Sequence, residues 1–164
     1  MWKTGNKVDI GETEMLARIF EHIEQKGKVV IGTDSMLTNK KFIFVNAVCL
    51  IGKQSNHHGK FFFTRYASKD EANKNLLVRL LKETTDSIEI ANKLREKYPK
   101  ANIEIHMDVN PSSKFLSGKY SSTVIGYILG CGYDYKIKPD AYAASAVADR
   151  HTRPTSTYIK KHYS

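Results

Sequence analysis

The sequence has few cysteines and no long apolar run, and each absence excludes a class of protein. Cys49 and Cys131 are too few for the disulfide framework of a small secreted domain. Neither has cysteine or histidine partners at zinc-ligand spacing, and both lie in apolar segments, as reduced core cysteines of a cytoplasmic protein do. No apolar run approaches the roughly 20 residues that span a bilayer. No apolar segment follows the amino-terminal residues, so we expect neither a membrane span nor a secretion signal.

Acidic residues are also scarce relative to basic ones. The chain has 26 lysines and arginines against 17 aspartates and glutamates, a formal net charge of +9. A soluble chain this basic often binds a polyanion, and nucleic acid is the first candidate partner. The alternative is a solvated basic surface without a partner. With 41% hydrophobic and 26% charged residues, the composition is that of a globular protein and excludes wholesale disorder.

Internal repeats and low-complexity segments are absent, which favours one domain over residues 1–153 followed by a basic tail at 154–164. The first half of the domain predicts a helix and then strands joined by short polar turns. Strands connected in this way form an antiparallel meander. The expected elements are an amphipathic helix at 12–25 and strands at 28–35, 42–52 and 60–66.

After residue 68 the pattern alternates between helix and strand. A helical period extends over 68–98, where Thr84-Thr85 is a weak point, and Tyr98-Pro99 ends it. A meander followed by strand–helix crossovers gives an α/β fold with a mixed sheet and helices on both faces. The remaining expected elements are strands at 101–108 and 133–138 and helices at 120–130 and 140–150.

Two carboxylates follow buried strands of this expected sheet. Three β-branched residues at 29–31 precede the turn residues Gly-Thr-Asp-Ser, which contain Asp34, and Asp108 ends the strand at 101–108. If the two strands are parallel neighbours, both carboxylates emerge at the carboxyl edge of the sheet, where α/β proteins bind ligands. The alternative is that each aspartate makes local hydrogen bonds in a turn. His106, between two apolar residues, is expected to be packed or to support a carboxylate instead of acting as a base.

Two further acidic residues belong to the same half of the fold. Glu83 lies in the crossover helix, and Asp140 opens the last helix, where it is alternatively a capping residue. Gathered carboxylates repel one another, so their ionised state requires cations. Ligands that offer only oxygen suit Mg²⁺ or Mn²⁺. Two such ions, roughly 3.5–4 Å apart, can clamp the attacking and leaving oxygens of a phosphodiester.

Three segments resemble a bacterial family described as ribonuclease H-like. They are residues 31–35 (Ile-Gly-Thr-Asp-Ser), 105–110 (Ile-His-Met-Asp-Val-Asn) and 136–145 (Lys-Ile-Lys-Pro-Asp-Ala-Tyr-Ala-Ala-Ser), and the similarity extends over residues 12–153. The resemblance implies the ribonuclease H-like fold. In that fold a mixed five-stranded sheet, of three antiparallel strands and then two parallel ones in the order 3-2-1-4-5, carries helices on both faces.

The resemblance also implies roles for individual residues. Asp34 would bridge two Mg²⁺ or Mn²⁺ ions and Asp108 would be a second ligand. The helix glutamate matches Glu83, with Glu71 as the alternative. The last carboxylate matches Asp140, because Asp-Ala-Tyr-Ala-Ala is similar to the corresponding helix of RuvC-type resolvases. Asp149 is the alternative, and about 13.5 Å of helix would separate it from Asp140.

The implied activity is that of a metal-dependent nuclease acting on an RNA/DNA hybrid or a structured nucleic acid. The alternative is a nucleic-acid-binding module of the same fold without catalysis. The residues expected to contact the nucleic-acid backbone are Lys136, Lys138, Arg150 and Arg153. Protection of an edge strand is the alternative for the two lysines. A solvated basic tail is the alternative for the last arginine.

Overall fold

The centre of the fold is a long antiparallel hairpin. β3 (Lys28–Thr38) pairs with β4 (Lys41–Ile51) along its whole length, and most of both strands is buried. Asn39 and Lys40 join the two strands with φ values of 46° and 65°. This left-handed backbone is typical of two-residue hairpin turns, whose twist matches that of the strands. The computed structural model describes residues 1–52 and 60–152 of the chain.

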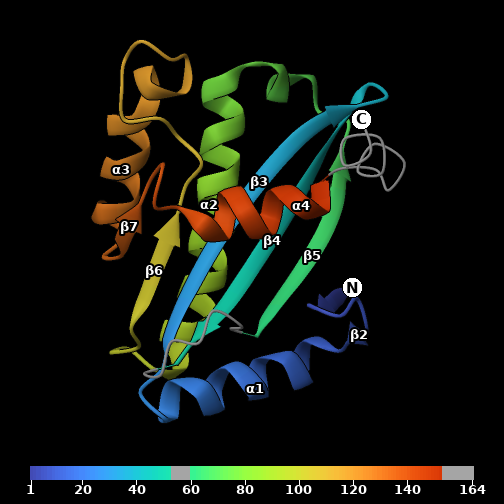
Figure 1. Ribbon diagram of the computed structural model, residues 1–164, viewed down its shortest axis with the longest axis vertical. Coiled ribbons are helices and arrows are strands. Elements are labelled where there is room, and N and C mark those ends of the chain that lie inside the picture. The colour runs from blue at the N-terminus through green and yellow to red at the C-terminus, as the bar shows by residue number, and fades with distance from the viewer. Residues whose placement is uncertain (53–59, 153–164) are drawn as a thin grey trace.

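The other strands extend the hairpin on both sides into one mixed sheet (Figure 1). β5 (Phe61–Ser68) is antiparallel to β4, whereas β6 (Ile103–His106) is parallel to β3, and β7 (Asp134–Lys136) is parallel to β6. Two short strands, β1 (Trp2–Thr4) and β2 (Asp9–Ile10), lie beyond β5. The complete strand order is β2-β1-β5-β4-β3-β6-β7.

The expectation of five strands is therefore wrong, because the sheet has seven within residues 1–52 and 60–152. The five expected strands are neighbours in the order β5-β4-β3-β6-β7, and the two extra strands form the edge beside β5. β1 and β2 contain three and two residues, which is too short to produce a period-2 pattern in the sequence. β1 becomes a strand because it pairs with the edge of β5, with Trp2 opposite Thr64.

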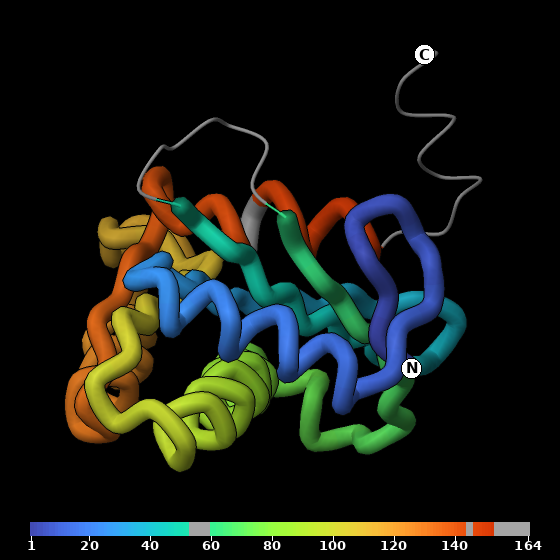
Figure 2. Tube along the Cα trace, turned by 90° about the horizontal axis from the view of Figure 1, so that it is seen from below, coloured from blue at the N-terminus to red at the C-terminus, as the bar shows by residue number. Residues whose placement is uncertain are grey.

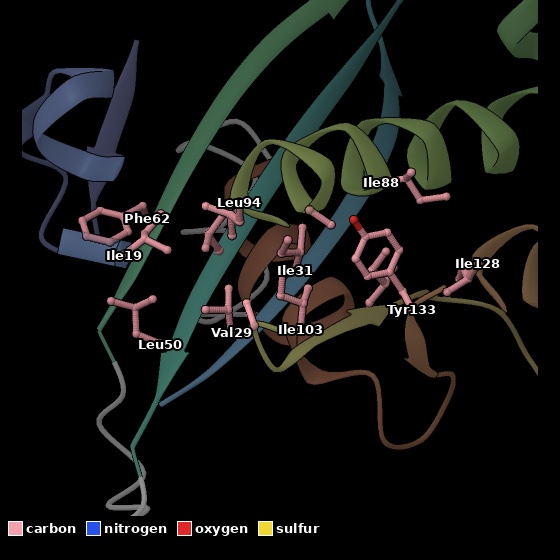
Figure 3. Close-up of a cluster of buried hydrophobic side chains, with 14 of the residues drawn as sticks. Ile19, Val29, Ile31, Leu50, Phe62, Ile88, Leu94, Ile103, Ile128 and Tyr133 are labelled. Carbon is pink, nitrogen blue, oxygen red and sulfur yellow. The ribbon is translucent and has the colours of Figure 1, made fainter. Parts of the chain in front are cut away.

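Three helices cover one face of the sheet and enclose the main hydrophobic core. They are α1 (Glu12–Glu24), α2 (Leu76–Lys97) and α3 (Ser121–Gly130). α2 is one continuous helix, and Asn75 caps its start by accepting a hydrogen bond from the Val78 N–H (3.1 Å). None of the helices in the described ranges is long and apolar enough to cross a membrane. Figure 3 shows core side chains that include Ile19, Val29, Ile31, Leu50, Phe62, Ile88, Leu94, Ile103, Ile128 and Tyr133.

Among the described residues, one irregular helical segment covers the opposite face. η3 (Ala143–Ala148) is a π-helix, and α4 (Asp149–Thr152) continues it. Figures 1 and 2 show this segment crossing β3 and β4 on the face opposite α2. Ala143 packs in a cluster with Val30, whereas Ala148 packs with Val45. Small side chains let the backbone of η3 approach the sheet closely, so the residues that follow it are held against β3.

Candidate active site

The register between β3 and β6 brings Asp34 and Asp108 to the same level of the sheet. The parallel pairing runs from Val29–Ile103 to Gly32–His106, and each aspartate lies two residues beyond the last pair. The expectation that Asp34 ends its strand is wrong. β3 continues beyond it because residues 35–38 go on pairing with β4. β6 does end at His106, so Asp34 lies in the part of β3 that is no longer paired with β6.

Asp34 is buried among other carboxylates. It is 8% exposed, and a hydrogen bond joins its carboxyl group to that of Asp149. Burial and the negative charges of Asp108 and Asp149 raise the pKa of Asp34 to about 8, although the Ser35 N–H partly opposes this shift. Carboxyl groups so arranged share protons at neutral pH, and their full ionisation requires a compensating cation.

Glu83 joins this group from α2. Its side chain is buried and accepts a hydrogen bond from the Ser35 hydroxyl at 2.5 Å. Burial and the charge of Asp34 raise the pKa of Glu83 well above its ordinary value, whereas Arg79 acts in the opposite direction. Glu71, the alternative from the sequence, is exposed in η1 (Glu71–Lys74), where it pairs with Lys74. The helix carboxylate beside Asp34 is therefore Glu83.

The fourth carboxylate of the group is Asp149, the alternative that the sequence offers to Asp140. Asp149 begins α4, directly after η3 has crossed β3. Asp140 is exposed in the turn ahead of η3, where its N–H donates to the carbonyl of Ile137. The expected helix at 140–150 does not open at Asp140. Its first residues form a turn, so Asp140 precedes the helix, whereas Asp149 lies at the junction of η3 and α4 and is partly buried.

A lysine lies at the corresponding level of the third parallel strand. His106 pairs with Lys136 of β7, and Lys138 follows two residues later. The Lys138 Nζ lies 3.3 Å from the Asp108 Oδ1, and that buried oxygen accepts no hydrogen bond from residues 1–52 or 60–152. With 44% of its side chain exposed, Lys138 can contact either Asp108 or a bound anion.

The other residues expected to contact nucleic acid lie near this group or outside the described residues. Lys136 is exposed on β7. Arg150 is exposed in α4, next to Asp149. Arg153, the basic tail at 154–164 and the end of the proposed domain lie outside the described residues.

Behind the carboxylates, a buried histidine connects β6 to η3. The Ala143 N–H donates to the His106 Nδ1 (3.3 Å), which places the ring proton on Nε2, and Nε2 donates to Glu104 (2.7 Å). Lys28 donates to the other oxygen of the Glu104 carboxylate at 3.0 Å. These contacts agree with the packed or supporting role expected of His106. The sequence gives no signal for Glu104 or for Ser35, because their partners are distant in the sequence.

The chemistry of the four carboxylates fits a hard divalent cation, because all the donors are oxygens and one of them, on Asp108, is buried without a hydrogen bond from the described residues. In the structure, however, these four side chains are not arranged around a common metal position. No three histidine, cysteine, aspartate or glutamate side chains in the described ranges converge as a metal centre. Asp34 and Asp149 bond to each other, Glu83 to Ser35 and Asp108 to Lys138. Rotation of these side chains is required before they share an ion.

Comparison with known proteins gives one significant result. The family model described as Ribonuclease H-like matches residues 13–153, which is most of the chain. The match includes all four carboxylates and confirms the resemblance carried by residues 31–35, 105–110 and 136–145. Neither the curated proteins nor the solved structures give a significant match.

Proposed function

The chain belongs to the ribonuclease H-like family, and on this basis we propose that it is a divalent-metal-dependent nuclease, which hydrolyses phosphodiester bonds in an RNA/DNA hybrid or a structured nucleic acid. The observation that carries the proposal is the register of β3 and β6, which brings Asp34 and Asp108 to one level of the sheet, with Glu83 and Asp149 as electrostatic neighbours of Asp34. Asp34 and Glu83 are buried, and like charges beside a buried carboxyl raise the free energy of its ionised form, which a purely structural role does not require.

Asp34 and Asp108 are the central ligands of the proposed site, since they come from adjacent strands at one register level. Glu83 and Asp149 complete it from the two opposite faces of the sheet. Bound Mg²⁺ or Mn²⁺ would supply electrostatic stabilisation of the attacking water and of the departing 3′ oxygen. Neighbouring side chains position the ligands. Ser35 orients Glu83 through its hydroxyl, and His106 fixes the start of η3 and thereby the position of Asp149.

Lys138 has two roles in this proposal. Without substrate it offsets the charge of Asp108 at 3.3 Å. With substrate bound, its long and partly exposed side chain moves to a phosphate oxygen, which frees the buried Asp108 oxygen. Exposed Lys136 and Arg150 would contribute contacts to the nucleic-acid backbone, which make binding sensitive to salt and largely independent of sequence.

The test is cleavage of labelled RNA/DNA hybrid, single strands and a four-way junction with Mn²⁺ present. We expect the wild-type protein to cut at least one substrate and Asp34→Asn to abolish cutting while its circular dichroism spectrum stays unchanged. Glu71→Gln is the matched control, because that exposed carboxylate lies in η1 and pairs only with Lys74 among the described residues. Cleavage that survives Asp34→Asn would overturn the proposal.

A second candidate, a nucleic-acid-binding module without catalysis, is favoured by one observation. Each of the four carboxylates already contacts another side chain, and the contact of Asp108 is the ammonium group of Lys138. A module of this kind would bind nucleic acid equally well in Mn²⁺ and in chelator and would release no product. Binding that strengthens with Mn²⁺ would argue against it.

A further inference from the structure

The loop at residues 109–116, which begins directly after Asp108, carries two exposed apolar side chains. Phe115 is 56% exposed and Leu116 is 66% exposed. The loop starts directly after Asp108, and Figure 1 shows it rising past the carboxyl end of β6, beside the first turns of α2. η2 (Ser117–Tyr120), which follows it, contacts α2. The two apolar side chains are therefore carried at the end of the sheet where Asp108 lies.

Hydrogen bonds within the loop and a close backbone approach fix its shape. The Asn110 N–H donates to the Ser117 hydroxyl (3.2 Å), and the Ser112 N–H donates to the Asn110 side chain (3.0 Å). A Cβ atom on Gly118 would lie 1.8 Å from the Ser112 carbonyl oxygen, so only glycine permits this approach. Phe115 and Leu116 are thus held outward by an ordered backbone.

The charge around these side chains is positive. Lys114 precedes them and Lys119 follows them, both exposed. The sequence contains no acidic residue from 109 to 133. An aromatic face flanked by lysines is suited to a base with its phosphates, because bases stack on aromatic rings and phosphates attract the ammonium groups. A protein or a lipid surface would accept the apolar pair, but the flanking lysines and the start of the loop directly after Asp108 favour nucleic acid.

We propose that residues 114–119 form a stacking lip, on which Phe115 and Leu116 receive an unpaired base next to the bond that is cut. This inference rests on the proposed nuclease function and narrows its substrate class to nucleic acids with unpaired nucleotides at the cleavage site. Bases inside a continuous duplex are stacked on one another and cannot reach the lip, whereas those of single strands, loops and junctions can. Lys114 and Lys119 hold the flanking phosphates.

The experiment compares binding of a labelled single strand and a blunt duplex of equal length, by fluorescence anisotropy in chelator. We expect the double variant Phe115→Ala/Leu116→Ala to weaken single-strand binding by about 5-fold to 100-fold, the range for loss of one stacked base. Duplex binding should change by less than about 2-fold, because it depends on backbone contacts. Leu129→Ala, another exposed leucine, on α3, is the matched control and should change neither. Equal losses of affinity for both substrates, or no loss, would overturn the proposal that residues 114–119 bind an unpaired base.

A second variant gives a direct signal. Phe115→Trp in a Trp2→Phe background places the chain's single indole on the lip, since Trp2 is the natural chain's one tryptophan. Single strands should quench its fluorescence, and the duplex should not. Quenching by anionic phospholipid vesicles in place of oligonucleotide would overturn the proposal and identify a lipid surface.

The two proposals fail differently. If the wild-type protein cuts nucleic acid with Mn²⁺ and the lip variants lose no single-strand affinity, the lip is overturned and the nuclease stands. If single-strand affinity depends on the lip but no substrate is cut, the nuclease is overturned and the lip stands as a binding surface. Absence of any nucleic-acid binding at low salt would overturn both.

Discussion

Asp34 and Asp108 each lie two residues beyond the Gly32–His106 pair that ends the parallel contact between β3 and β6. Side chains alternate between the two faces of a strand, so Asp34, two residues after Gly32, lies on the same face of β3 as Gly32. Burial is the main cause of the raised pKa of Asp34, and the negative charge of Asp108 adds to it. The parallel pairing of β3 and β6 therefore sets the positions of Asp34, inside β3, and of Asp108, two residues after β6 ends.

Removing the charge of Asp34 should stabilise the folded protein in the absence of metal. Asp34→Asn removes a carboxyl group whose ionised form is disfavoured by burial and by the charges of Asp108 and Asp149, so folding no longer requires its protonation at pH 7, and it keeps a hydrogen-bonding side chain of equal size. We expect the free energy of unfolding at pH 7 in chelator to rise by about 1–3 kcal/mol, as urea denaturation would measure it. Asp140→Asn, a change at an exposed aspartate, should have no effect. A variant less stable than the wild type would contradict this assignment of charge repulsion.

Neutralising a proposed metal ligand should lower cleavage, whereas neutralising its alternative from the sequence should not. Glu83→Gln and Asp149→Asn should each lower cleavage on the order of 100-fold or more, because each removes a charge from the proposed metal site. Their matched counterparts, Glu71→Gln and Asp140→Asn, should cleave normally. Single-turnover rates with Mn²⁺ measure the difference, and a reversed order within either pair would contradict the proposed ligand set.

His106→Leu should loosen η3. The substitution leaves the Ala143 N–H without its acceptor and Glu104 without one of its two hydrogen-bond donors. We expect a loss of about 2–4 kcal/mol in the free energy of unfolding. Hydrogen exchange should also accelerate in the segment 143–149, more than in β4. Unchanged exchange in that segment would show that His106 does not position η3.

Stability should fall in mild acid through His151. Its ring stacks on Phe63 with centroids 3.8 Å apart, and its Nε2 is buried without a hydrogen bond from the described residues. Burial, with smaller effects of Lys7 and Arg150, lowers the pKa of His151 to about 4. Below its ordinary pKa of 6.5 the unfolded chain binds a proton that the folded chain does not, so stability falls as pH drops from about 6.5 to about 4.

The matching variant is His151→Phe, which keeps a ring beside Phe63 and cannot be protonated. The free energy of unfolding of the variant relative to the wild type should increase steadily as pH falls through this window. Urea denaturation at intervals between pH 7 and pH 4 measures the relative value. Parallel pH profiles for the two proteins would contradict the role of His151.

The sequence predicts the parts of this fold that long apolar patterns determine. The strands β3 to β6, α1 and the approach of Asp34 to Asp108 all follow from such patterns, because buried parallel strands leave only a few ways to order a sheet. β1 and β2 give no pattern, since they form only by pairing with β5. The choice of Asp149 over Asp140 also escapes the sequence, because it depends on η3 starting at Ala143 and winding as a π-helix.

The central claim is that Asp34 and Asp108 hold divalent ions together. Isothermal titration calorimetry of Mn²⁺ into the wild-type protein and into Asp34→Asn tests it most directly. We predict that the wild-type protein binds about two ions per chain and that Asp34→Asn binds none in the same concentration range. Equal Mn²⁺ binding by both proteins, or no binding by the wild type, would contradict the claim.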